Sequence, residues 1–579
     1  MSHHSFTQRA LRALRALRTL RTLRPLRPLR RPLSLLKGRL VSSDRATIIS
    51  PTQLIICVAL FIGLFNNYSF FSQVWAIYPP NGDNLLFVGS LFCVLLLFTA
   101  LLISVFAVGP LLKPALIATL LVSANTGYFM DTYHIVIDDV MLDNMLRTDR
   151  AEAFDLLSAS QALYFIALGV LPSVAVAFAP VRRTPYLKAV RARLGFLCAC
   201  LFSITALLLL QGSSYASFFR EHKSVRFYAN PSYAFYSVGR LGAGLFDRAT
   251  RPYLQIGLDA NRAASSTRRK IVVMVVGETL RADHLGINGF ERQTSPRLWQ
   301  SNVISFNNAW SCGTSTAVSV PCMFSFLNHE NYDQAAALAT DNALDVIQRT
   351  GVSVTWLENN SDSKGVALRV PSLDFKHAET NSACDSECRD VGMIDGLAAI
   401  LEETTEGDLL VVLHQMGNHG PSYYKRYTQE LERFAPTCQT NQLESCSREE
   451  IVNAYDNAVL YTDHFLGETI EWLNQLDNQF ENQFDTSLLY VGDHGQSLGE
   501  RNFFLHGLPY RFAPDTQKHV LLIFWFGKNW PENDIKTLTN LTQKGSAISH
   551  DNVSHTLLGL FDIDTALYEK DQDILAMKL

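Results

Sequence analysis

The sequence predicts two joined parts: an α-helical transmembrane domain of five helices, followed by an extracytoplasmic α/β domain. Apolar stretches of bilayer-spanning length lie within the first 213 of 579 residues, with basic residues between alternate stretches. After about residue 268, short apolar strands alternate with longer mixed segments, as in α/β domains. We therefore expect a basic tail at 1–50, a membrane domain at 51–213, a linker at 214–268 and an α/β domain at 269–579.

In the N-terminal tail, leucine and arginine recur every third residue, in the run ALRALRALRTLRTLRPLRPLRRPL. This period drifts around a helix instead of forming one face, and Pro25, Pro28 and Pro32 would break a helix. Residues 1–45 hold twelve basic residues and Asp44, which gives this segment a net charge of +11. Because the whole chain carries −4, the remaining residues carry −15. We expect a disordered cytoplasmic tail near anionic lipid, and no nucleic-acid partner.

Five apolar stretches follow, each near the ~20 residues that a bilayer requires: 52–71, 85–109, 114–130, 160–181 and 194–212. The third is the shortest, and a buried helix is its alternative. Residues 1–45 and 182–193, the latter with five basic residues, are cytoplasmic by the positive-inside rule, whereas the acid-rich loops at 78–84 and 131–158 lie outside. Five spans therefore place the α/β domain outside the cytoplasm.

Six of the ten cysteines form close pairs in the C-terminal half: Cys312 with Cys322, Cys384 with Cys388, and Cys438 with Cys446. This spacing suits three short-loop disulfides, which persist in a periplasm-like compartment. Unrelated buried thiols are the alternative for any one pair. Metal binding by Cys384 and Cys388 is disfavoured because no second Cys or His pair follows. The other four cysteines lie in the apolar stretches and are expected to be free thiols.

The linker is aromatic and basic, as in YASFFREHKSVRFYANPSYAFYSVGRL, and is too charged to span a bilayer. We expect helices that lie in the membrane interface with Tyr and Phe at headgroup level. An ordinary linker with aromatic residues in the core is the alternative.

Four strands are readable in the α/β domain, at 271–276, 352–357, 409–413 and 487–491, and each ends in polar residues. These are Glu278; Asn359 and Asn360; His414 and His419; and Asp493 and His494. Ligands gather outside the carboxyl ends of strands in open α/β sheets. One polar strand end is ordinarily a helix cap or a turn, but four such ends together predict a site.

Glu278, Asp493 and His494 offer two carboxylates and an imidazole, a ligand set that suits Zn²⁺, with Mn²⁺ as the alternative. A metal there could activate a hydroxyl as a nucleophile. The segment CGTSTAVSV supplies the hydroxyls of Ser311, Thr314, Ser315 and Thr316 just before a helix-like run, whose N-terminus would stabilise a phosphoryl oxyanion. Spacing alone leaves open which hydroxyl attacks.

Six segments in the same order closely resemble phosphoethanolamine transferases that modify lipid A: GETLRADHLGINGFERQTSPRL, CGTSTAVSVPCMFS, NNSDSKGV, CRDVGM, LHQMGNHGPSYYKRY and GDHGQSLGE. These enzymes belong to the sulfatase and alkaline phosphatase superfamily, and the resemblance is nearest to the subgroup conferring colistin resistance. It covers nearly the whole chain except the Arg-rich tail. It implies an extracytoplasmic domain of alkaline-phosphatase/sulfatase type.

The resemblance also implies roles for individual residues. Glu278, Thr316, Asp493 and His494 would bind one tightly held zinc ion, with Thr316 as the nucleophile. Asn360, Lys364, His419 and His506 would surround the phosphoryl group or a second zinc ion. Without the resemblance, Lys364 reads equally as a solvated loop lysine and His506 as a turn histidine, while His414 is expected to be structural.

Asn144, Thr148 and Glu152 recur every four residues, which places them on one helical face. From the sequence alone, a solvated amphipathic face is the favoured reading. In the resembled family the matching residues line the ethanolamine headgroup site, with Glu152 as a partner for the ammonium group.

The expected reaction transfers phosphoethanolamine from phosphatidylethanolamine to a phosphate of lipid A through a phosphoethanolamine-threonine intermediate. The added amine would weaken binding of cationic peptides such as polymyxins and colistin. We expect a monomer in the inner membrane of a Gram-negative cell, in contact with membrane lipids. Two alternatives stay open: transfer of phosphoethanolamine or phosphoglycerol to another acceptor, such as core sugar, periplasmic glucan or water, and a non-enzymatic membrane sensor.

Overall fold

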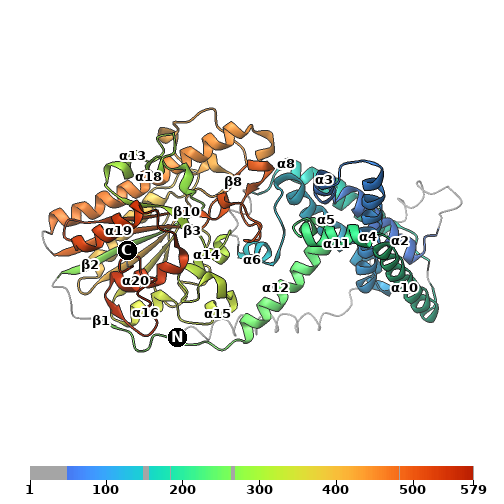
Figure 1. Cartoon of the computed structure of the whole chain (residues 1–579), viewed down its shortest axis with the longest axis horizontal. Helices are drawn as coiled ribbons and strands as arrows, with labels where there is room; N and C mark the ends of the chain where they lie inside the picture. Colours follow the sequence, from blue (N-terminus) through green and yellow to red (C-terminus); the bar gives the residue numbers. More distant parts are fainter. Residues whose placement is uncertain (1–47, 148–155, 183, 263–267, 481–482, 578–579) are drawn as a thin grey trace, which may run out of the picture. The chain divides into compact units, whose positions relative to one another are not determined.

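A computed structural model describes residues 48–147, 156–182, 184–262, 268–480 and 483–577 (Figure 1). Residues 50–179 and 183–579 form one compact unit. The other unit comprises residues 1–49 and 180–182, and in its described part Ile49 forms a β-bridge with Val181. The basic tail expected at the N-terminus lies outside the described residues, apart from Ile48 to Ser50.

The N-terminal half of the described chain is helical, as the apolar stretches predict. Its helices are α2 (Pro51–Phe65), α3 (Tyr68–Ile77), α4 (Gly82–Phe106), α5 (Leu112–Tyr133), α6 (Asp139–Arg147), α8 (Ala159–Phe165), α9 (Leu171–Phe178) and α10 (Tyr186–Leu210). Ser50, Asn81 and Ser158 each accept a backbone N–H at a helix N-terminus, beginning α2, α4 and α8. A π-helical turn (Ile166–Val170) joins α8 to α9 just before Pro172.

Three described helices are long and apolar enough to cross a bilayer: Asn84–Phe106, Ala159–Phe178 and Tyr186–Leu210. A fourth span results if α2 and α3, which meet at a bend of 58°, cross together. Helix α5 has 22 residues but buries polar Ser123 and Thr126 among its neighbours. The third predicted stretch therefore has the character of a buried helix, the alternative that its sequence left open.

The linker forms α11 (Gly212–Glu221), a short 3₁₀ helix and α12 (Ser232–Thr250). On α12, Tyr236, Val238 and Phe246 are exposed although they are large and apolar. This exposure is compatible with the predicted interfacial position, which stays a prediction.

The C-terminal half is built on an eight-stranded sheet of order β11-β3-β10-β7-β2-β6-β4-β5. The strands are β2 (Arg269–Gly277), β3 (Ile304–Trp310), β4 (Ser353–Glu358), β5 (Ser372–Asp374), β6 (Leu409–His414), β7 (Phe484–Gly492), β10 (His519–Phe526) and β11 (Ile548–Ser549). The four predicted strands are the adjacent parallel strands β7, β2, β6 and β4. Strands β3 and β10 were not predicted; they pair antiparallel to each other, and β10 is also antiparallel to β7.

Strand β2 shows why the central strands are apolar throughout. Val273 and Val275 face one hydrophobic core, whereas Val272, Met274 and Val276 face the other. Both faces are buried, so the run does not alternate with polar residues. Figure 1 shows α18 (Arg448–Gln479) along one side of the sheet and α16 (Ala343–Arg349) and α20 (Val553–Leu560) along the other.

Candidate functional site

Strand register brings the polar strand ends to one edge of the sheet. Gly277 of β2 pairs with Gly492 of β7, so the residues that follow them, Glu278 and Asp493, are neighbours. Val276 of β2 pairs with His414, the last residue of β6. Residues more than 200 positions apart in the sequence thus meet where the parallel strands end.

Glu278, Asp493 and His494 form one fully buried cluster. Each offers a ligand atom, and these atoms all lie within 4.8 Å of one another. His494 Nε2 is 3.5 Å from Glu278 Oε1 and 3.3 Å from Asp493 Oδ2. Its Nδ1 lies 2.9 Å from the Gly495 carbonyl, which leaves Nε2 directed at the two carboxylates.

Thr316 brings a hydroxyl to this cluster. It is the first residue of α14 (Thr316–Met323), and its Oγ1 donates to Glu278 Oε2 (3.1 Å) and lies 3.4 Å from His494 Nε2. Of the other hydroxyls in the segment, Ser311 donates to the Gly313 carbonyl and Thr314 to the Leu508 carbonyl. The Ser315 hydroxyl is buried with no hydrogen-bond partner among the described residues. Thr316 is therefore the hydroxyl best placed to react.

The cluster fits a divalent cation on three observations. Asp493 Oδ2 is buried and has no hydrogen-bond partner within the described part of the chain. Burial raises the pKa of Glu278, with a further contribution from Asp493, and burial raises the pKa of Asp493 to about 6. Burial also lowers the pKa of His494, which favours the neutral imidazole. Two buried carboxylates beside a neutral imidazole form a donor set that a cation such as Zn²⁺ would complete.

Asn360 and Lys364 adjoin the cluster through hydrogen bonds. Asn360 Nδ2 donates to Glu278 Oε2 (3.0 Å) and to the Gln415 carbonyl (3.0 Å). Lys364, only 1% exposed, donates from Nζ to Ser361 Oγ (2.5 Å), and Ser361 Oγ in turn donates to Asn360 Oδ1 (3.0 Å). Lys364 is thus a buried cation beside the site and not a solvated loop lysine.

His419 and His506 face each other across the site, with ring centroids 5.6 Å apart, and His506 lies 4.2 Å from the His494 ring. His506 Nδ1 is 2.8 Å from Gln496 Oε1. An amide oxygen only accepts, so Nδ1 carries the proton and Nε2 is left unprotonated in the neutral ring. Burial lowers the pKa of His506 well below its usual value, with smaller contributions from His494 and His419.

A cavity of about 70 Å³ adjoins these two histidines. It is lined by Phe129, Ile135, Ile137, Met141, Asn144, Met145, Leu156, His419, Gly420, Leu505 and His506. Asn144, in α6, lines this cavity together with the two histidines, and its role at the ethanolamine headgroup stays a prediction. Thr148 and Glu152 lie outside the described residues. The lining is mainly apolar, which suits the lipid end of a substrate.

All three cysteine pairs are bonded in the structure: Cys312–Cys322, Cys384–Cys388 and Cys438–Cys446. The other four cysteines are free thiols. The Cys312–Cys322 bond closes the segment that carries Thr316. Cys384–Cys388 precedes Asp390, whose buried carboxylate accepts from Met416 N (2.8 Å) and Gly417 N (3.1 Å) in the loop before His419.

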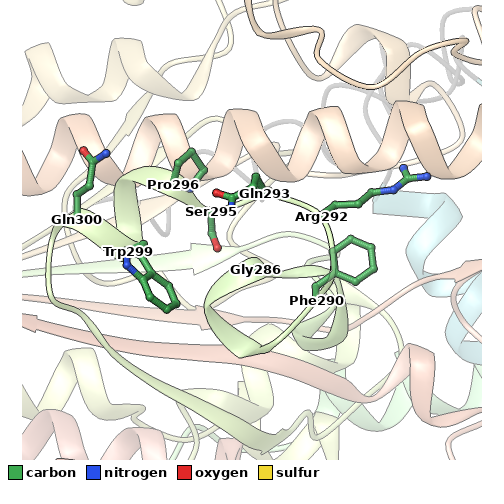
Figure 2. A pocket seen from close by; sticks show the side chains of 8 residues that line it. All are labelled: Gly286, Phe290, Arg292, Gln293, Ser295, Pro296, Trp299 and Gln300. Carbon is green, nitrogen blue, oxygen red and sulfur yellow. The ribbon is translucent and has the colours of Figure 1, made fainter.

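A second hollow, of about 220 Å³, lies away from this chemistry, over α13 (Pro296–Gln300) and the loop before it (Figure 2). Figure 2 shows Trp299 and Gln300 at one end and Phe290 and Arg292 at the other. None of the predicted site residues lines it. This hollow therefore carries none of the chemistry predicted from the sequence.

Several residues that hold the site together were not predicted from the sequence. Gln496 orients His506, and Glu358 accepts from Trp356 Nε1 (2.9 Å) and the Asn360 N–H (2.8 Å) and lies 3.0 Å from His414 Nδ1. Burial alone would lower the pKa of His414, but Glu358 raises it above its usual value. Gln496 could have been noticed because it follows His494 by two residues, whereas no local pattern marks Glu358.

Comparisons with known proteins agree over nearly the whole chain. The Sulfatase family matches residues 270–563, and the family described as phosphoethanolamine transferase EptA/EptB matches residues 95–244. The phosphatidylethanolamine transferase Mcr-1 of Escherichia coli is 45% identical over 540 residues, which is 90% of this chain and 97% of that protein. Phosphoethanolamine transferase EptA of Salmonella typhimurium is 38% identical over 79% of this chain and 84% of its own.

A solved structure, the integral membrane protein lipooligosaccharide phosphoethanolamine transferase A (EptA) of Neisseria meningitidis, superposes with a TM-score of 0.86 at 36% identity. The match covers 91% of this chain and 99% of that one. The soluble domain of the same Neisseria protein gives a TM-score of 0.52 at 40% identity, over 56% of this chain and 98% of its own. The expected architecture, a helical membrane region followed by a sulfatase-type α/β domain, is confirmed.

Proposed function

The chain belongs to the EptA/EptB phosphoethanolamine transferases of the sulfatase superfamily, and from this premise we propose that it transfers phosphoethanolamine from phosphatidylethanolamine to a phosphate of lipid A. The observation that carries the proposal is the Thr316 hydroxyl, which contacts two members of the buried cluster of Glu278, Asp493 and His494. Its position at the start of α14 also directs helix N–H groups toward a phosphoryl group bound there.

The first step forms a bond between Thr316 Oγ1 and the phosphorus of phosphatidylethanolamine and breaks the phosphorus–oxygen bond to diacylglycerol. The Thr316 hydroxyl points its proton at Glu278 Oε2 (3.1 Å). Zn²⁺ held by Glu278, Asp493, His494 and Thr316 would lower the pKa of that hydroxyl. His419 supplies the proton that the departing diacylglycerol oxygen requires, and the proton that Thr316 releases replaces it. The unprotonated Nε2 of His506 can only accept.

The second step reverses the first with a new partner. An oxygen of a lipid A phosphate attacks the phosphorus of the phosphoethanolamine-threonine, and Thr316 Oγ1 leaves and regains a proton. Lys364 is held beside the site by its hydrogen bond to Ser361, which in turn donates to Asn360. Its positive charge would lie near the phosphoryl group in both steps. Such a charge stabilises the transition state more than the bound substrate when it is held rigidly.

The apolar cavity beside His419 and His506 supports a lipid donor. We propose that it receives the glycerol end of phosphatidylethanolamine and that Asn144, with Thr148 and Glu152, contacts the ethanolamine headgroup. The catalytic domain then works on the periplasmic face of the inner membrane of a Gram-negative cell. Adding a cationic amine to lipid A would weaken polymyxin and colistin binding.

Mass spectrometry of lipid A tests the proposal. A Gram-negative host without such an enzyme would express the wild type and, separately, Thr316→Ala, with equal amounts of protein in the membrane. We expect lipid A to gain the mass of one phosphoethanolamine with the wild type alone. A gain with Thr316→Ala would remove Thr316 from the mechanism, and no gain with folded wild type would contradict lipid A as the acceptor.

Trapping the covalent intermediate tests the donor lipid independently of the acceptor. Purified protein given phosphatidylethanolamine without lipid A should acquire one phosphoethanolamine on the peptide that contains Thr316. Phosphatidylglycerol serves as the matched donor control and should leave that peptide unmodified. Modification by phosphatidylglycerol in preference would favour phosphoglycerol transfer instead.

A further inference from the structure

Thr279, which follows Glu278 at the end of β2, has an unusual backbone. Its φ is 58°, in the left-handed region, and its side chain is fully buried. A β-branched residue rarely adopts this conformation because its side chain crowds the backbone. Such conformations persist where neighbouring groups hold them, and they gather at functional sites.

The left-handed turn lets Thr279 hold both carboxylates of the cluster. Its N–H donates to Asp493 Oδ1 (3.0 Å), and its hydroxyl donates to Glu278 Oε1. The His494 N–H also donates to Asp493 Oδ1 (2.6 Å). Oδ1 therefore accepts two hydrogen bonds, while Oδ2 keeps its lone pairs and lies 3.3 Å from His494 Nε2.

Tyr455, from helix α18, holds the turn that contains Thr279. Its hydroxyl donates to the Thr279 carbonyl (2.8 Å) and accepts from the Arg281 N–H (3.0 Å). The ring is completely buried and packs edge-on against His284 and Tyr423. One hydroxyl thus bonds both ends of the 279–281 turn from a rigid helix.

We propose that Thr279 is a positioning residue for the zinc site and that the Tyr455 hydroxyl holds its backbone in the left-handed conformation. The inference rests on the zinc site of the proposed function. Groups that hydrogen-bond to metal ligands and orient them contribute strongly to metal affinity, and losing one typically weakens metal binding 10- to 100-fold. Thr279 is such a group for two ligands at once.

The first test removes only the Tyr455 hydroxyl. The dissociation constant of zinc would be measured by competition with a chelating dye on the purified full chain in detergent. We expect Tyr455→Phe to bind zinc at least ~10-fold more weakly than the wild type. Tyr461→Phe is the matched control, because it also removes a tyrosine hydroxyl from α18. The Tyr461 ring packs against Arg389 and not against the 279–281 turn, so the zinc affinity of this variant should equal that of the wild type.

The second test changes the Thr279 side chain. Thr279→Val keeps the β-branched shape but loses the bond to Glu278 Oε1, and we expect zinc binding to weaken ~10-fold or more. Thr279→Ser keeps the hydroxyl and relieves the crowding, so its affinity should stay near that of the wild type. If Thr279 had a merely structural role, Thr279→Val would lower the thermal unfolding midpoint, and Thr279→Ser would not restore zinc affinity.

The outcomes distinguish this inference from the proposed function. Wild-type zinc affinity in folded Tyr455→Phe and in Thr279→Val overturns the positioning role. If Tyr455→Phe does not fold, the comparison of zinc affinity between Thr279→Val and Thr279→Ser tests the positioning role by itself. A wild type that binds zinc but transfers nothing to lipid A contradicts the proposed acceptor and leaves the positioning role intact, whereas a wild type that binds no zinc overturns both.

Discussion

At the scale of single residues, the site depends on two buried carboxylates. Glu278 and Asp493 are both inaccessible to solvent, and burial raises the pKa of each. Thr279, Thr316 and Asn360 donate hydrogen bonds to them, but Asp493 Oδ2 has no partner among the described residues. A metal ion would be the strongest partner available to that oxygen.

Zinc binding should therefore depend on pH. Metal binding needs the ionised carboxylates, and burial raises the pKa of Asp493 to about 6. Affinity should be full above that pH and fall as the pH drops through it, by up to about tenfold per unit for each proton displaced. Dye competition at about pH 7.5 and about pH 5.5 measures this. In Asp493→Asn the slope should be shallower, and an equal affinity for wild type at both pH values would contradict the expectation.

Lys364 provides a second residue-scale prediction. Lys364→Met keeps the buried stem but removes the charge, so we expect kcat to fall by about 10²-fold or more because phosphoryl charge is no longer stabilised. Zinc affinity should stay unchanged, since the hydrogen bonds among the described residues connect Lys364 to Glu278 through Ser361 and Asn360. Steady-state transfer assays and zinc titration of the same preparation would test it. A loss of zinc together with activity would show a structural role instead.

At the scale of elements, strand β2 needs its final glycine because β7 fills the adjacent space. A Cβ on Gly277 would lie 1.9 Å from the Tyr490 hydroxyl, and Tyr490 is fully buried within β7. The glycine lets the two strands approach closely enough for Glu278 and Asp493 to meet. The Cys312–Cys322 bond similarly joins the loop before α14 to the helix that starts with Thr316.

Gly277→Ala should thus destabilise the protein. Overpacking in a filled core typically costs about 1–3 kcal/mol, which should appear as a lower thermal unfolding midpoint of the full chain in detergent. Gly239→Ala is the control, because a Cβ at Gly239 in α12 meets nothing within 4 Å. The expectation fails if both variants unfold at the wild-type temperature.

At the scale of the whole molecule, the chain combines apolar helices with a disulfide-bonded catalytic domain. Three disulfides lie in the C-terminal half, and the free thiols lie in the helical half. Disulfides persist outside the reducing cytoplasm, so this division agrees with the positive-inside prediction that the tail is cytoplasmic and the catalytic domain periplasmic.

The orientation can be tested by protease protection. In spheroplasts, external protease should digest the C-terminal domain, while an N-terminal epitope tag stays intact until the membrane is permeabilised. The reason is the net charge of +11 in residues 1–45, which favours the cytoplasmic side. Loss of the tag in intact spheroplasts would contradict a cytoplasmic N-terminus.

The sequence by itself determined the helical membrane region, the α/β domain, its four central strands and the strand-end residues Glu278, Asp493 and His494. These follow from local signals: apolar runs, charge asymmetry and motifs at strand ends. It could not find β3 and β10, which pair across a long separation, or show α5 to be a buried helix. The family resemblance implied Thr316, and the tertiary structure places its hydroxyl against Glu278 and His494. Only the tertiary structure brought Tyr455 and Glu358 to the site. Those contacts join residues up to 178 positions apart, and no local pattern records such pairing.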